Sequence, residues 1–127
     1  MKTKFIFLLA FVCTLLASCA TEPAQTRADR IRTLLLNCDE SSVIVVAHRA
    51  DWRNFPENSL EAIQSSIDMG VDMLEIDVQR TKDGVLMLMH AHDLNRMTNG
   101  TGNIADTTWE EISKLNLKDH QGNMTPY

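Results

Sequence analysis

The sequence predicts an α/β protein with a largely parallel sheet, and three segments support this fold class. Residues 43–47 form an apolar run with the length of a strand that is buried on both faces. Residues 58–70 then repeat apolar side chains at helical spacing, and residues 71–79 alternate as a second strand. Strands that alternate with helices along a chain are typical of parallel sheets.

Three helices are predicted, at residues 28–37, 58–70 and 107–115. The side chains expected to face inward are Ile31, Leu34 and Leu35 in the first helix, Leu60, Ile63 and Ile67 in the second, and Trp109, Ile112 and Leu115 in the third. An apolar stripe of this kind needs a partner surface, so each helix is expected to pack on the sheet or on a neighbouring segment.

Capping residues indicate where the second and third helices begin and end. Asn58 is the expected N-cap of the second helix, with Glu61 three residues later, and Gly70 is expected to end that helix. Thr108 and Glu111 have the spacing of a capping box at the start of the third helix.

The second strand carries two carboxylates on one face. In residues 71–79 the apolar side chains from Leu74 to Val78 alternate with Glu75 and Asp77, so the two acids point the same way. Twice the rise per residue of a strand separates them by about 7 Å. Such a pair offers hard oxygen ligands for Ca²⁺ or Mg²⁺, although a further ligand is needed to hold the cation.

A hairpin is expected after this strand, because Asp83-Gly84 is a strong turn signal. A two-residue turn places His90 opposite Asp77, and a turn one residue earlier places it opposite Glu75. Either register sets an imidazole beside the carboxylates. His92 falls on the same side only if the strand continues, and it is expected to face solvent.

The N-terminus has the pattern of a secretory signal peptide. Lys2 and Lys4 precede an apolar run, and the segment that ends in Cys19 resembles the lipobox of bacterial lipoproteins. We therefore expect a lipoprotein signal peptide at residues 1–18, a lipid on Cys19 and a polar tether at residues 19–27. The alternative is a transmembrane anchor, but the apolar run is shorter than the ~20 residues that span a bilayer.

Composition then limits the partners of the mature chain. Removing the two lysines of the signal leaves 10 basic and 17 acidic side chains, a net charge of about −7, which argues against a nucleic-acid partner. Cys38 is left alone, so a disulfide framework is excluded. Membrane attachment is expected through the lipid, at the bacterial cell envelope, in the periplasm or at the surface.

Polar residues of several kinds gather at the predicted strand ends: His48, Arg49, Glu57, Glu75, Asp77 and His90. Two histidines can divide acid and base roles, and an arginine matches a phosphate. Together with a metal they favour phosphoryl transfer over acyl transfer. Each residue also has an ordinary interpretation, as a rim charge, a core histidine or a helix-start acid. His120 is expected to face solvent.

These residues carry a family resemblance. The segment AHRADWRNFPENSLEAIQSSIDMGVDMLEIDVQRTKDGVLMLMHAHDLNRMTNGTG resembles the opening of the glycerophosphodiester phosphodiesterases, with HRG, PEN, ExD, TKDG and HD followed by LxRxTxGxG in that order. The resemblance covers residues 43 to about 117. It implies a TIM (β/α)₈ barrel, of which residues 28–127 would be the first strand-helix units. It also implies hydrolysis of glycerophosphodiesters to glycerol 3-phosphate and an alcohol, with a divalent metal.

The resemblance assigns roles to most of the polar residues. His48 matches the first catalytic histidine and Arg49 the phosphate-binding arginine, and Glu57 matches the acid of PEN. Glu75 and Asp77 match metal ligands of the family. Ungapped alignment places the second catalytic histidine at His90.

The sequence departs from the family pattern at two positions. Ala50 replaces the glycine of HRG, where a methyl crowds the backbone or forces a φ that glycine tolerates better. Ala91 replaces the aspartate after the second histidine, while His92-Asp93 resembles a displaced copy of that pair. The family's further metal-binding glutamate is expected beyond residue 127, so we predict that these 127 residues lack full activity alone.

Two other functions compatible with these residues remain open. One is a non-catalytic remnant or phosphate-ester-binding module. The other is a phospholipase C-like enzyme that acts on inositol lipids.

Overall fold

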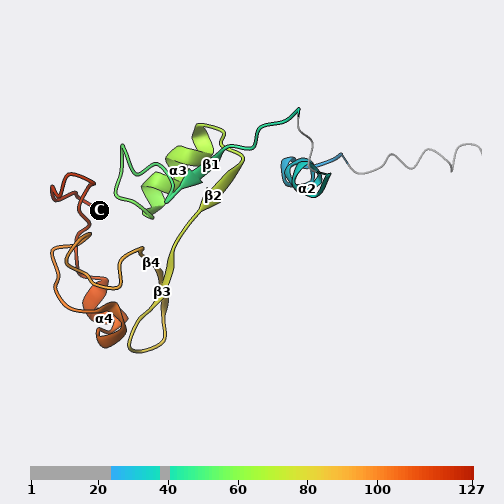
Figure 1. The fold of residues 1–127 in the computed structure, drawn as a ribbon. Helices are drawn as coiled ribbons and strands as arrows, with labels where there is room; N and C mark the ends of the chain where they lie inside the picture. Colours follow the sequence, from blue (N-terminus) through green and yellow to red (C-terminus); the bar gives the residue numbers. More distant parts are fainter. Residues whose placement is uncertain (1–23, 38–40) are drawn as a thin grey trace, which may run out of the picture. The chain divides into compact units, whose positions relative to one another are not determined.

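A computed structural model describes residues 24–37 and 41–127 of the chain (Figure 1). The predicted signal peptide, Cys19 and Cys38 lie outside these residues. The chain divides into two units, Met1–Glu40 and Ser41–Tyr127. In the part that the structure describes, no helix is long and apolar enough to cross a membrane.

The first unit contains helix α2, Arg27–Asn37, which confirms the first predicted helix. It begins where Thr26 and Asp29 exchange hydrogen bonds: the Asp29 amide donates to the Thr26 hydroxyl, and the Thr26 amide donates to the Asp29 carboxylate. A hydrogen bond from the Thr26 hydroxyl to the Asp29 carboxylate, with the one from the Thr26 amide, lowers the pKa of Asp29. Ile31 is buried as predicted, but Leu35 is exposed, so the predicted inward stripe is only partly right.

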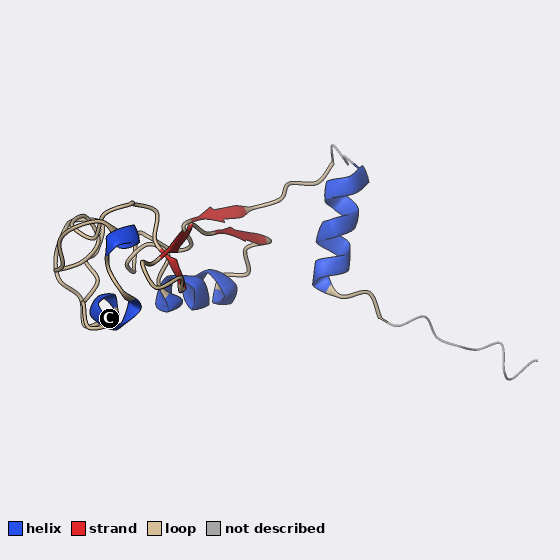
Figure 2. Ribbon diagram, turned by 90° about the horizontal axis from the view of Figure 1, so that it is seen from below, coloured by secondary structure: helices blue, strands red, loops and turns tan. Residues whose placement is uncertain are grey.

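The second unit opens with a β-α-β arrangement. Strand β1, Val46–His48, pairs in parallel with β2, Met73–Glu75, and helix α3, Leu60–Asp68, connects them. In Figures 1 and 2 helix α3 lies alongside this strand pair. The register sets His48 beside Glu75. A parallel pair brings the carboxyl ends of both strands to one edge, which is the property that the site depends on.

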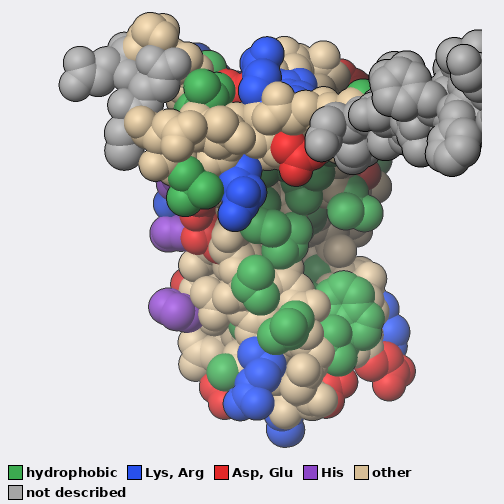
Figure 3. Space-filling model, turned by 90° about the vertical axis from the view of Figure 1, so that its right-hand side faces the viewer, with side chains coloured by type: hydrophobic (Ala, Val, Ile, Leu, Met, Phe, Trp, Pro, Cys, Tyr) green, Lys and Arg blue, Asp and Glu red, His purple; other side chains and the backbone are tan. Residues whose placement is uncertain are grey.

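The prediction that residues 43–47 are buried on both faces is wrong. Strand β1 starts three residues later than expected, and Val43, Val45 and Val46 are exposed. The reason is that β1 has one strand neighbour, β2, in the described chain. Exposed apolar side chains also gather on the face seen in Figure 3.

Helix α3 is capped by Ser59 and not by Asn58, which corrects the predicted cap. The Ser59 hydroxyl accepts a hydrogen bond from the Ala62 amide, and Asn58 lies before the helix in a left-handed conformation. Gly70, with a φ of 75°, follows the helix end as predicted.

The buried face of α3 also differs from the predicted stripe. Ala62 and Ser66 are the buried side chains, whereas Leu60 and Ile67 are exposed. Small residues on this face let the helix approach the loop after β1, where the Asp51 amide donates to the Ala62 carbonyl.

The predicted second strand is divided in two, because Ile76 and Asp77 lie between β2 and strand β3, Val78–Arg80. Strand β3 forms an antiparallel hairpin with β4, Leu86–Leu88, through the predicted turn. The turn has three loop residues, since the Thr81 amide donates to the Val85 carbonyl, and Gly84 has a φ of 88°.

Both predicted hairpin registers are therefore wrong by one residue. Val78 pairs with Leu88, and the Met89 amide donates to the Asp77 carbonyl. Met89, and not His90, is thus the residue opposite Asp77. A one-residue change moves a side chain to the other face of a strand.

A small core forms beyond the hairpin, around the 3₁₀ helix η1, Ile104–Asp106, and helix α4, Trp109–Ile112. Its buried members are Met89, Leu94, Met97, Ile104 and Ile112, with Met87, Leu115 and Leu117 packed against them. Residues 93–103, predicted as a polar loop, contribute two of these side chains.

Helix α4 is shorter than the predicted helix at residues 107–115. The predicted capping pair is present, because the Thr108 amide donates to the Glu111 carboxylate at 2.9 Å. This bond, with one from the Thr108 hydroxyl, lowers the pKa of Glu111. Ile112 faces the core as predicted, but Trp109 is 42% exposed, so its predicted inward orientation is wrong.

Candidate active site

The carboxyl edge of the β1–β2 pair carries the first two predicted site residues. His48 ends β1 and Glu75 ends β2, and they are register partners. The His48 Nε2 and Glu75 Oε2 atoms are 3.9 Å apart, and both side chains are partly exposed. The predicted placement of these residues at strand ends is confirmed.

Arg49 contacts all three predicted acids. Its amide donates to Glu75 Oε2 at 3.0 Å, and its Nη1 donates to Glu57 Oε2 at 3.2 Å. Its Nε lies 3.7 Å from Asp77 Oδ2, is buried and has no hydrogen-bond partner. A buried guanidinium is stabilised by carboxylates on several sides, and this one keeps an unused donor.

The backbone around Arg49 is strained. Arg49, Ala50 and Asn58 have φ values of 55°, 61° and 61°, in the left-handed region that disfavours residues with a Cβ. This conformation costs roughly 1–2 kcal/mol each for Arg49 and Ala50, whereas asparagine adopts it more readily. Ala50 is buried, and its φ confirms the prediction that this position suits glycine better than alanine. Strain of this kind persists where surrounding contacts hold it.

Asn58 supplies contacts of that kind. Its Nδ2 donates to Asp77 Oδ2, and its Oδ1 accepts from the Asp77 amide, both at 3.0 Å. Its own amide donates to the Arg49 carbonyl at 3.1 Å. Asn58 therefore ties the loop after β1 to the residue between β2 and β3, and it fixes Asp77 beside Arg49.

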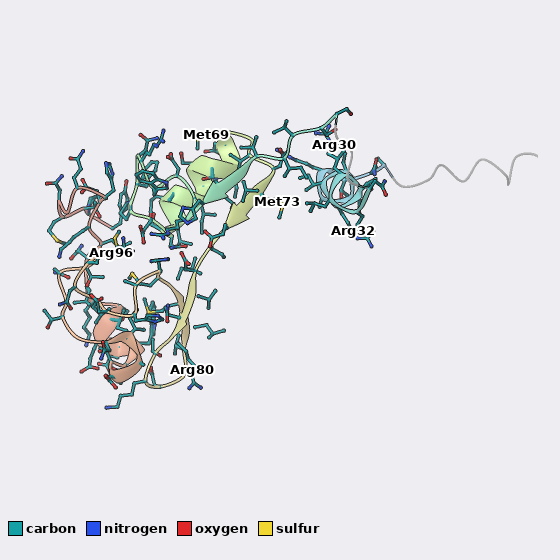
Figure 4. The ribbon with its side chains drawn as sticks, in the orientation of Figure 1. Arg30, Arg32, Met69, Met73, Arg80 and Arg96 are labelled. Carbon is teal, nitrogen blue, oxygen red and sulfur yellow. The ribbon has the colours of Figure 1, made fainter. Side chains whose placement is uncertain are left out.

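Arg96 belongs to the site, although the sequence assigned it no role there. It comes from the loop between β4 and η1 and is labelled in Figure 4. Its Nη1 donates to Glu57 Oε2 at 3.2 Å, and its Nη2 donates to Glu57 Oε1. The signal that could have found it is the arginine of the LxRxTxGxG pattern.

Glu57 is therefore held by two arginines. Burial alone would raise the pKa of Glu57, but the hydrogen bonds and charges of Arg96 and Arg49 outweigh burial and lower the pKa below its ordinary value. The Glu57 side chain is 10% exposed, and Arg96 is the more exposed of its two partners. Glu57 is thus an ionised connector between two guanidinium groups.

A cleft of about 540 Å³ opens beside these residues. The residues that line it are His48, Arg49, Trp52, Glu57, Arg96, Met97, Asp119, His120, Gln121 and Gly122. Three of them were predicted as site residues. His120, predicted to face solvent, is exposed and also lines the cleft. A cleft of this size accommodates a small organic molecule.

His90 does not join this group of side chains. It follows the end of β4, is exposed, and accepts a long hydrogen bond from the Gln79 side chain through its carbonyl. Among the described residues its imidazole makes no ion pair or hydrogen bond with Glu75 or Asp77. His92 is also exposed, and its carbonyl accepts from the Ile104 amide. Neither histidine lines the cleft.

Glu75 and Asp77 fit a hard divalent cation by donor type. Glu75 Oε1 and Asp77 Oδ1 have no hydrogen-bond partner within the described ranges, because the contacts of both side chains fall on their second oxygens. No cluster of three or more His, Cys, Asp or Glu residues suited to a metal occurs in those ranges. Glu75 and Asp77 therefore stay the predicted metal ligands, with one carboxylate oxygen each that lacks a partner in those ranges.

The model of the glycerophosphoryl diester phosphodiesterase family matches residues 48–126, which include all of these side chains. The chain belongs to this family. A glycerophosphodiester phosphodiesterase of Caldanaerobacter subterraneus is 47% identical over 72 residues, which are 57% of this chain and 30% of that protein. Glycerophosphodiester phosphodiesterase 1 of Rattus norvegicus is 37% identical over 95 residues, 75% of this chain and 28% of that protein.

Solved structures of the family agree with this assignment. A glycerophosphoryl diester phosphodiesterase from Parabacteroides distasonis matches 80% of this chain and 36% of its own, with a TM-score of 0.69 and 35% identity. An Oleispira antarctica phosphodiesterase in complex with the product sn-glycerol-3-phosphate matches 58% of this chain and 30% of its own, with a TM-score of 0.56 and 34% identity. The predicted fold class, part of a TIM barrel, is confirmed.

This family member spans about a third of the length of the relatives that it matches.

Replacing Asn58 should destabilise the chain. In Asn58→Ala the two side-chain bonds to Asp77 are lost and a left-handed φ is left on alanine, so the free energy of unfolding should fall by about 2–3 kcal/mol. Asn58→Gly loses the same bonds without the backbone strain, so its free energy of unfolding should fall by about 1 kcal/mol less than that of Asn58→Ala. Urea unfolding measures both variants. Equal stability of the wild-type protein and the two variants would contradict a stabilising role of the Asn58–Asp77 hydrogen bonds.

Removing Arg96 should raise the pKa of Glu57. Since the folded pKa of Glu57 is lowered, its contribution to stability is present above the unfolded pKa and is lost as pH falls through the folded pKa. In Arg96→Gln the folded and unfolded pKa values lie closer together, so the loss of stability on acidification should be smaller and complete at a higher pH.

Carboxyl ¹³C NMR titration of Glu57 and urea unfolding between pH 7 and pH 3 measure this effect. Lys114→Gln, which removes an exposed pair with Glu110, is the control. A pKa of Glu57 that is the same with and without Arg96 would refute the arginine pairing.

Proposed function

We propose that the protein containing this chain hydrolyses glycerophosphodiesters to glycerol 3-phosphate and an alcohol, with a divalent metal. Family membership supports this reaction, and so does a relative solved with sn-glycerol-3-phosphate. The single observation that carries the proposal is the arrangement at the β1–β2 edge. There His48 and Arg49 line one cleft, and Arg49 contacts the carboxylates of Glu75 and Asp77 behind it.

Arg49 is the proposed phosphate ligand. Its side chain lines the cleft beside His48 and Arg96. The Arg49 side chain is 20% exposed, and a guanidinium at the cleft can bind a phosphodiester oxygen by charge-assisted hydrogen bonds. Arg96 is the proposed positioning residue, because it donates to Glu57, and Glu57 in turn orients the Arg49 guanidinium.

The proposed chemistry needs one base and one acid. The base removes the proton of the glycerol hydroxyl next to the phosphodiester, that oxygen bonds to phosphorus, and the bond to the alcohol breaks as the acid gives it a proton. Water then opens the cyclic phosphate to glycerol 3-phosphate. His48, at the cleft, takes one role, and the family pattern gives the other to His90.

Glu75 and Asp77 are the proposed metal ligands, through the oxygens that have no other partner. Bound Ca²⁺ or Mg²⁺ would offset negative charge on the phosphoryl oxygens. The glutamate contact with the Arg49 amide fixes the position of Glu75 relative to the phosphate ligand.

A phosphate-ester-binding module without catalysis is the second candidate. The exposed position of His90 outside the cleft favours it, since one acid-base residue is then missing. Turnover by the intact protein separates the two candidates.

We further propose that the protein is a lipoprotein of the bacterial cell envelope, attached to a membrane through Cys19. The signal pattern of residues 1–18 supports this localisation.

Substitution of the cleft residues should abolish turnover of glycerophosphocholine by the intact protein. We expect His48→Ala and Arg49→Lys each to lower kcat/KM by about 10²–10⁴-fold, because a proton carrier and a planar donor fork are lost. His90→Ala should have an effect of the same size, and His92→Ala should leave kcat/KM within about threefold.

Enzymatic detection of released glycerol 3-phosphate, with and without chelator, measures these rates. Lys114→Gln serves as the unaffected variant. Wild-type protein without metal-dependent turnover would contradict the enzyme proposal, and full activity of His48→Ala would contradict the role of that histidine.

Cys19→Ala should release the protein from membranes. Lipid attachment through a single residue is the only membrane contact in this proposal, so the variant should move from the membrane fraction to the soluble fraction after cell lysis. Fractionation and immunoblotting report the distribution. Retention of Cys19→Ala in the membrane fraction would exclude the lipid anchor.

A further inference from the structure

The residues that line the cleft fall into two groups by their contacts. Arg49 and Arg96 are joined through Glu57 and form the cationic group. Trp52 and His120 form the second group, with ring centroids 5.6 Å apart and planes at 79°. The proposed reaction uses the first group for the phosphate and leaves the second group without a role.

Asp119 gives the second group a fixed negative charge. Its Oδ1 accepts from the Gln121 and Asn123 amides, each at 2.9 Å, and its Oδ2 accepts from Asn123 Nδ2 at 3.0 Å. The Asn123 side chain is the largest cause of a lowered pKa for Asp119, and the charge of His120 adds to it. The carboxylate is therefore ionised at neutral pH and held rigidly at the cleft wall.

The Trp52 indole already accepts a cation. The Arg53 guanidinium carbon lies 5.4 Å from the ring centroid, a distance typical of cation–π contacts. Burial raises the pKa of Asp51, but hydrogen bonds from Asn54 and Ser65 outweigh it and lower the pKa, and the charge of Arg53 adds to the lowering. Arg53 is thus close to an acid of its own. Asp119 has no arginine or lysine among the groups that shift its pKa.

We infer that Trp52, Asp119 and His120 form the subsite for the leaving alcohol and select an alcohol that carries a positive charge. This inference rests on the proposed function. A diester of choline or ethanolamine type has an anionic phosphate and a cationic alcohol. The arginine group matches the first charge, and the carboxylate with the indole matches the second.

The matched probes are glycerophosphocholine and glycerophosphoglycerol, which share the glycerophosphate half and differ in the charge of the alcohol. Isothermal titration of the protein with each should give a dissociation constant about threefold to tenfold lower for glycerophosphocholine. In Asp119→Asn and in Trp52→Leu this preference should disappear, while the constant for glycerophosphoglycerol stays within about twofold.

Two control variants complete the experiment. Trp109→Leu removes the other tryptophan of the chain, which does not line this cleft, and should keep the preference. Arg49→Gln should weaken both diesters by the same factor. Circular dichroism checks that each variant is folded, and the two subsite variants test the inference independently.

The outcomes are distinct. Equal binding of both diesters by the wild-type protein, or a preference that survives in both subsite variants, would overturn the inference and leave the proposed function standing. Binding of neither diester would overturn the proposed function and the inference together.

Discussion

Arg49 is the residue on which the rest of the site depends. Its main-chain and side-chain nitrogens meet acids from three segments: Glu57 before helix α3, Glu75 at the end of β2 and Asp77 before β3. An arginine that is largely buried is costly without such partners, and the three acids would repel one another without the arginine. The loop after β1 and the β2–β3 junction are thus held together by charge as well as by strand pairing.

The same segments hold a backbone that would be unfavourable elsewhere. Arg49, Ala50 and Asn58 are all left-handed, and all three lie within the loop that joins β1 to α3. The amide of Asn58 bonds to the carbonyl of Arg49, and its side chain bonds to Asp77, so the strained residues are secured at both ends. Alanine in place of the family glycine adds strain at position 50 without releasing these contacts. The loop therefore presents His48 and Arg49 in a fixed direction, as a site that binds a charged group requires.

Arg96 extends this network into the second half of the folded unit. It comes from the loop that contributes Leu94 and Met97 to the small core, so packing of apolar residues fixes the arginine that pairs with Glu57. The loop at residues 118–123 closes the other side, where Trp52 meets His120.

The sequence by itself determined the fold class, the approximate helices, and the convergence of His48, Arg49, Glu57, Glu75 and Asp77. These depend on local periodicity and motif spacing, which are readable along the chain. Only the tertiary structure decided the hairpin register, because Asp83-Gly84 fits turns of two and of three loop residues. It also decided the cap of α3, where Ser59 caps the helix and Asn58 is used by Asp77. Arg96 and Glu57 lie 39 residues apart in sequence, and no local pattern encodes a pairing that the packing of separate segments creates.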